Sequence, residues 1–154
     1  MADRVFASIR IGGVLTASDF ADLSRLIADE DLAFEEADEP FAPDHRVVGE
    51  PLRLYAHDVA WGRITELEAW CVAKRLPVAR WSGSCVAQWS AERVVFTGAD
   101  DPCSYMTDED DRVVIDRATV MRLGSVDAII AHFEAADVEV PPLVVEGEEA
   151  ARAA

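Results

Sequence analysis

Residues 50–83 constrain the fold more than any other segment, because two extended stretches there flank one amphipathic helix. Apolar side chains alternate with other residues from position 52 to 56, which is the spacing of a half-buried strand. Apolar residues between positions 64 and 71 then recur at helical spacing. Pro77 ends that helix, and another extended stretch follows it. The segment therefore predicts a β-α-β unit.

The N-terminal part of the chain repeats this pattern 44 positions earlier. Residues 5–11 alternate as a strand, and Gly12-Gly13 turns the chain. Thr16 or Ser18 is the expected N-cap of the next helix. The helix has an apolar stripe and precedes an extended stretch at residues 32–34. Two β-α-β units in sequence predict an α+β fold of the ferredoxin-like split arrangement.

The remaining chain extends these two units with a β-hairpin and a C-terminal helix. Residues 93–97 and 113–115 are the predicted hairpin strands, joined by a long acidic connection. Asp116 is the expected N-cap of a helix that Gly124 interrupts. We expect a single domain over residues 1–145, with an acidic, frayed tail at residues 146–154.

The charge of the chain is strongly negative and unevenly distributed. The net charge is −16 over 154 residues, and neither residues 29–39 nor residues 100–111 include a basic side chain. Such a surface repels nucleic acid and anionic lipid and attracts basic partners. Three tryptophans supply large rings of the kind that anchor protein interfaces. The residues expected to bind the partner are Asp29, Glu30, Asp31, Glu35, Glu36, Asp38, Glu39, Asp100, Asp101, Asp108, Glu109, Asp110, Asp111, Trp61, Trp81 and Trp89.

These features favour a non-enzymatic acidic binding protein that docks on a basic surface of a macromolecular partner. Dense carboxylates can imitate the phosphates of a duplex, as in phage- or plasmid-borne anti-restriction and anti-CRISPR inhibitors. An immunity protein, antitoxin or adaptor subunit is a further alternative. A third is a small-molecule-binding domain or enzyme with a cleft near His57, Trp61 and Trp81, since His57 follows a predicted strand.

Motifs for catalysis, metals and cofactors are absent from the sequence. Gly12-Gly13 lacks the remaining residues of a phosphate-binding loop. Cys85 and Cys103 lack the close spacing of a zinc site, and the aspartates of residues 108–111 lack the pattern of a calcium loop. No stretch is apolar enough to span a membrane or to act as a signal peptide. Three cysteines without paired spacing favour a reducing, cytoplasmic location.

Overall fold

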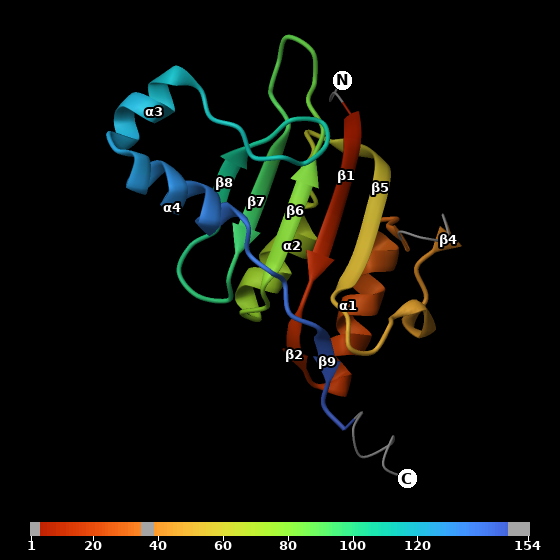
Figure 1. Ribbon diagram of the computed structural model, residues 1–154. Coiled ribbons are helices and arrows are strands. Elements are labelled where there is room, and N and C mark those ends of the chain that lie inside the picture. The colour runs from red at the N-terminus through yellow and green to blue at the C-terminus, as the bar shows by residue number, and fades with distance from the viewer. Residues whose placement is uncertain (1–3, 35–38, 148–154) are drawn as a thin grey trace.

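The computed structural model describes residues 4–34 and 39–147, which form a mixed α+β fold around one antiparallel sheet (Figure 1). The seven strands of this sheet have the order β4-β3-β5-β1-β6-β7-β8. They are β1 (Arg4–Ile11), β3 (Ala33–Phe34), β4 (Glu39–Pro40), β5 (Leu52–Ala60), β6 (Val78–Ser82), β7 (Glu92–Phe96) and β8 (Cys103–Met106). The other elements are β2 (Gly13–Leu15), β9 (Leu143–Val145), a 3-10 turn (Pro43–His45), α1 (Ala17–Asp29), α2 (Thr65–Ala73), α3 (Arg117–Leu123) and α4 (Val126–Ala136).

The core lies between the sheet and the two helices α1 and α2, which cover one of its faces (Figure 1). Leu23 of α1 and Leu67 of α2 are fully buried against strand residues such as Ile9. Each such side chain contributes about 1.5–3 kcal/mol by leaving water. The helical and strand spacings expected from the sequence are therefore confirmed for both β-α-β units. Of the two expected N-caps of α1, Thr16 is the one used, since its side chain accepts from the Asp19 amide.

The C-terminal segment returns to the start of the chain and closes a second, two-stranded sheet. β9 pairs in parallel with β2, and the preceding segment crosses in front of the main sheet (Figure 1). Gly12 explains this approach, because a Cβ atom there would lie 1.9 Å from the Pro141 carbonyl oxygen. The short edge strand expected after Pro142 is confirmed, and the Gly12-Gly13 turn serves chain packing.

The prediction that residues 113–115 form the hairpin partner of β7 is wrong. β7 pairs with β8 across the turn at residues 97–102, whereas Val113 makes only an isolated bridge with Thr107. Gly98 and Asp100 both have positive φ in this turn, which lets the chain reverse within a few residues. The shorter connection therefore forms the hairpin, and residues 107–116 become a loop.

Helices α3 and α4 lie beside β8 and bury little of their apolar surface (Figure 1). Their boundaries follow the sequence, with Asp116 and Ser125 as N-caps and Gly124 left-handed between them. The apolar stripe of the last helix is not core, since Val126 is 70% exposed and Ala136 alone in α4 is buried. Residues 148–154 of the expected tail lie outside the described residues.

Candidate docking surface and neighbouring cleft

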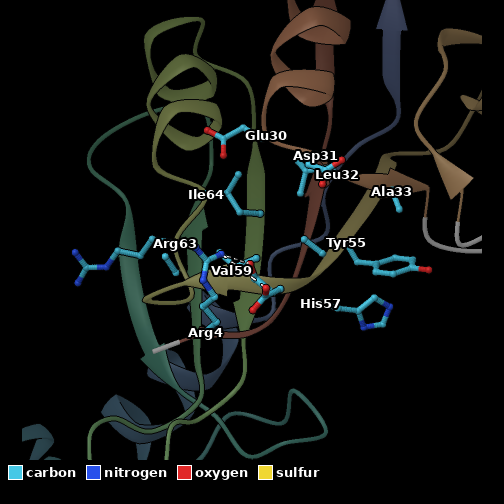
Figure 2. Close-up of a pocket in the computed structure, with 13 residues that line it drawn as sticks. Arg4, Glu30, Asp31, Leu32, Ala33, Tyr55, His57, Val59, Arg63 and Ile64 are labelled. Carbon is cyan, nitrogen blue, oxygen red and sulfur yellow. Dashed lines mark hydrogen bonds and ion pairs between the residues drawn. The ribbon is translucent and has the colours of Figure 1, made fainter. Parts of the chain in front are cut away.

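A cleft of about 530 Å³ opens between the end of α1, the end of β5 and the start of α2 (Figure 2). Glu30 and Asp31 line one side, and Arg4 and Arg63 lie on the other. Arg4 is 3.9 Å from Asp58, which also lines the cleft. The cleft therefore presents both signs of charge to a ligand.

The Glu30 carboxylate lies in a crowd of like charges. Its pKa is raised above the ordinary value of 4.5, first by burial and then by Glu66, Glu68 and Asp29, while a backbone hydrogen bond from Glu66 opposes this. The carboxylates come together because α1 ends beside the first turn of α2. Acidic side chains are favoured in that turn by the positive end of the helix dipole. Glu68 is neutralised by Arg80. The remaining charges attract a cation at this point of the surface.

Only part of the first expected acidic cluster can be placed. Asp29, Glu30 and Asp31 lie together where α1 ends. Glu39 belongs to β4, but the position of its side chain is not described. The other three acidic residues expected in this cluster lie outside the described residues; they are Glu35, Glu36 and Asp38.

The second expected acidic cluster is divided between two loops. Asp100 and Asp101 are exposed in the turn between β7 and β8. Residues 108–111 lie in the loop after β8, and three of their carboxylates form ion pairs with Arg112 or with Arg93 of β7. Arg112 binds Asp108 and Asp110, with nitrogen–oxygen distances of 2.8 and 3.1 Å. The other two acidic residues of this loop also have partners. Asp111 forms an ion pair with Arg93, and Glu109 accepts a hydrogen bond from the Ser84 hydroxyl.

The three tryptophans expected at the interface occupy two places. Trp61 is 54% exposed and its ring centroid lies 5.8 Å from that of Trp89. Both line a smaller cavity of about 250 Å³. Trp81 packs on Phe6 on the sheet and donates its indole N–H to Thr107. Of the three residues expected around one cleft, His57 lines the large cleft, Trp61 lines the smaller cavity and Trp81 lies on the sheet.

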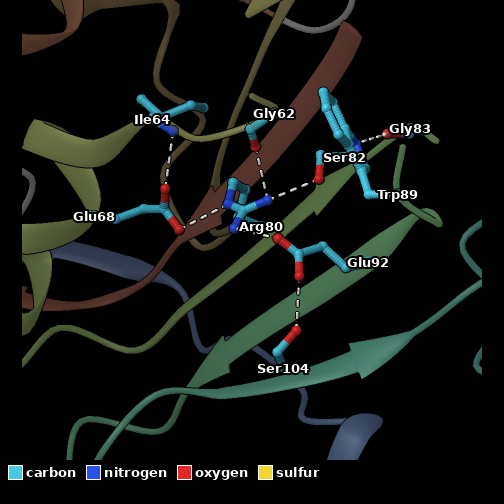
Figure 3. Close-up of polar contacts among 9 residues, drawn as sticks. All are labelled: Gly62, Ile64, Glu68, Arg80, Ser82, Gly83, Trp89, Glu92 and Ser104. Carbon is cyan, nitrogen blue, oxygen red and sulfur yellow. Dashed lines mark hydrogen bonds and ion pairs between the residues drawn. The ribbon is translucent and has the colours of Figure 1, made fainter. Parts of the chain in front are cut away.

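A buried arginine that sequence reasoning missed links these elements (Figure 3). Arg80 on β6 is 3% exposed. Its guanidinium donates to Glu68 at 2.7 Å and to Glu92 at 3.1 Å. It also donates to the Gly62 carbonyl and the Ser82 hydroxyl, both at 2.8 Å. Arg80 shares its face of β6 with Val78 and Ser82, all of them buried, so the signal in the sequence was limited to its alternation with Val78.

The described residues contain no cluster of three or more acidic, histidine or cysteine side chains that could hold a metal ion. Nor is any helix among them long and apolar enough to cross a membrane. The cysteines form no disulfide.

Cys71 is expected to resist thiol reagents in the folded protein. It is fully buried in α2, and burial followed by the nearby Glu68 raises its pKa from 9.0 to about 12. At neutral pH its thiolate fraction is therefore about 1,000-fold below that of an ordinary thiol. Titration with Ellman's reagent should modify the exposed Cys103 first and Cys71 only after denaturant is added. Equal rates for these two cysteines would contradict the buried position.

Comparison with known proteins gives no further assignment. No family model, curated protein or solved structure matched this chain. Any function must therefore be argued from its own residues.

Proposed function

We propose that this protein is a non-enzymatic acidic binding protein that docks on a basic surface of a macromolecular partner. The main observation that supports this proposal is the group of carboxylates around Glu30, which lies beside a cleft wide enough for a long side chain. Bringing these like charges together costs free energy in the isolated chain. A lysine or arginine side chain from a partner would remove that cost, which gives the surface its preference for a basic partner.

The carboxylates around Glu30 are a stronger candidate for this contact than the loop at residues 108–111. Arg112 and Arg93 already neutralise three of the loop's four carboxylates, whereas Asp29 and Glu66 form no ion pair with a described residue. Imitation of nucleic-acid phosphates, as in an inhibitor of a nuclease or defence complex, is the narrower form of this proposal. An immunity protein, antitoxin or adaptor subunit would use the same surface.

A small-molecule-binding domain is the second candidate, and the mixed charge of the cleft favours it. Glu30 and Asp31 at the end of α1 line the cleft together with Arg4, Arg63 and His57 (Figure 2). A zwitterionic ligand would place its cation on the carboxylates and its anion on the arginines. This ligand would compete with a basic side chain for Glu30.

Two finer features belong to the same proposal. The order β3-β5-β1-β6, with α1 and α2 as the two crossover helices, supports a ferredoxin-like arrangement. Three reduced cysteines support a cytoplasmic location.

Neutralising the carboxylates at the end of α1 is expected to weaken binding to a basic probe more than neutralising others. The variant Glu30→Gln/Glu66→Gln should bind a fluorescent hexalysine peptide about fivefold more weakly than the native chain at low salt, since each exposed pair contributes up to about 1 kcal/mol. The matched control Asp100→Asn/Asp101→Asn removes the same charge from the β7–β8 turn. Fluorescence anisotropy at two salt concentrations measures both variants.

Equal weakening by the two variants would contradict a site at Glu30 and leave only the effect of net charge. The free energy of unfolding provides a second measurement, because neutralising Glu30 should weaken binding but raise stability. Because the pKa of Glu30 is raised in the folded state, its ionised form destabilises the fold at neutral pH, and this cost disappears as the pH falls through the folded pKa. Glu30→Gln should therefore raise the free energy of unfolding at neutral pH by no more than about 0.5 kcal/mol, because solvent screens the site.

A further inference from the structure

The sheet has a second face, on the side that α1 and α2 do not cover and that the C-terminal segment crosses (Figure 1). Ile9 and Leu54 point into the core, so the alternate positions on β1 and β5 point to the opposite side. Arg10 of β1 lies directly opposite Arg53 of β5 in the antiparallel register. Side chains at such positions have Cα atoms about 4.5–5.5 Å apart. The pairing thus places the two arginines next to each other on this face, and both line the same cavity.

This arginine pair has no counter-ion in the described chain. Neither Arg10 nor Arg53 forms an ion pair or a side-chain hydrogen bond with residues 4–34 or 39–147. Like charges directly opposite one another destabilise a sheet, and this chain has carboxylates in excess that could have neutralised them. The two arginines therefore carry an unfavourable contact that an anion would relieve.

The arginine pair borders a cavity of about 260 Å³ that Ser8 and Asp111 also line. The Asp111 carboxylate is already bound to Arg93, with Oδ1 2.9 Å from Nε. Ser8 adds a hydroxyl that can donate to an oxyanion. The negative net charge acts weakly here, because charges beyond about 8 Å are screened at physiological salt. The cavity can therefore hold a phosphate-sized anion.

Aromatic rings lie on the same face, further along the same two strands. The ring of Phe6, which is 37% exposed, lies 5.4 Å from that of His57, 5.7 Å from that of Tyr55 and 6.0 Å from that of Trp81. Phe6 lies two positions from Ser8, which lines the cavity, and this spacing corresponds to about 7 Å along a strand. Aromatic rings on the face of a sheet can stack on nucleic-acid bases. We propose that Arg10 and Arg53 bind the phosphate of a nucleotide whose base lies against Phe6 and His57.

Binding of nucleoside monophosphates tests this site. Each of the four common ribonucleoside monophosphates is titrated by calorimetry into the native chain, the double variant Arg10→Gln/Arg53→Gln, and the exposed control Arg25→Gln. We expect at least one monophosphate to bind the native chain and the control equally. The double variant should bind it about tenfold or more weakly, since each charge-assisted hydrogen bond contributes appreciably. The matching nucleoside without phosphate should also bind about tenfold more weakly.

Melting temperature separates loss of binding from loss of structure. Because the two arginines repel each other, the double variant should melt at or above the temperature of the native chain. A lower melting temperature would assign the arginines a structural role and overturn the proposal. So would the absence of binding by all four monophosphates, or equal binding of nucleotide and nucleoside. The docking proposal around Glu30 does not depend on the result.

Discussion

Replacement of Arg80 by methionine is expected to destabilise the protein by about 3–5 kcal/mol, the cost of removing one partner from a buried ion pair. Arg80 donates to Glu68 and Glu92 and to the Gly62 carbonyl oxygen (Figure 3). Methionine fills a similar volume but leaves all these acceptors without their donor. Glu68 would be affected most, because its side chain is 19% exposed and also accepts from the Ile64 amide at the start of α2.

Equilibrium unfolding in urea at neutral pH measures this loss, with Arg25→Met as the matched control. Arg25 is an exposed helix residue that pairs with Asp22 and with no other residue that the structure describes, so its replacement should cost less than about 0.5 kcal/mol. A loss below about 1 kcal/mol for Arg80→Met, the range of an exposed pair, would contradict the role assigned to the buried network.

The same variant should change how stability depends on acid. Burial alone would raise the pKa of Glu92, but hydrogen bonds from Ser104 and Arg80 outweigh it and hold the pKa below its ordinary value of 4.5. A carboxyl whose folded pKa is lowered contributes stability above its unfolded pKa and loses it as the pH falls through the folded value. Below about pH 4.5, the Arg80→Met variant should therefore lose less stability with falling pH than the native chain does.

The elements that hydrophobic spacing determines could be predicted from the sequence. β1, β5, α1 and α2 each bury one face, so their apolar residues recur with the period of the element. The caps at Thr16, Asp116 and Ser125 follow from side chains that can accept from a free backbone amide. These local rules were enough to place both β-α-β units.

The remaining structure depends on pairings that a linear pattern does not contain. The segments around Val113 and Cys103 are alternative partners for the same edge of β7. The tight turn at Gly98 selects the segment that begins at Cys103, which is β8. Arg80 and Arg93 are buried only because carboxylates from distant elements reach them. The candidate anion site likewise requires Arg10 and Arg53 to meet across two strands 43 positions apart. Charge counts cannot show which acidic residues are already paired.

Replacement of Arg93 by methionine is expected to release α3 and α4 while the rest of the sheet stays folded. Arg93 donates to the Ala136 carbonyl oxygen at 2.8 Å and to the Asp137 carboxylate at 2.9 Å, where α4 ends. It also holds the Asp111 carboxylate of the loop before α3. Burial alone would lower the pKa of Arg93, but its bonds to Asp137 and Asp111 raise it, so it stays charged.

The loss should be local because, among the residues that the structure describes, the other attachment of these helices to the sheet is a ring contact between His132 of α4 and Tyr105 of β8, whose centroids lie 5.1 Å apart. α3 buries no residue and α4 buries only Ala136. Removing hydrogen bonds to charged groups, each contributing about 1.5–3 kcal/mol, should raise amide exchange in α3 and α4 by about tenfold or more. Mass-spectrometric hydrogen exchange follows this change, with β1 and β5 as internal references.

Arg112→Met is the matched control, since Arg112 lies in the same loop but its ion pairs within residues 4–34 and 39–147 are with the neighbouring Asp108 and Asp110 alone. It should leave exchange in α3 and α4 unchanged, because both of its partners belong to its own turn. Uniform loss of protection in β1 and β5 with Arg93→Met would mean that Arg93 supports the whole fold. Unchanged exchange in α4 would mean that contacts other than Arg93 attach the helices. The expected result, fast exchange confined to α3 and α4, follows from a helical pair held to the sheet mainly by one arginine.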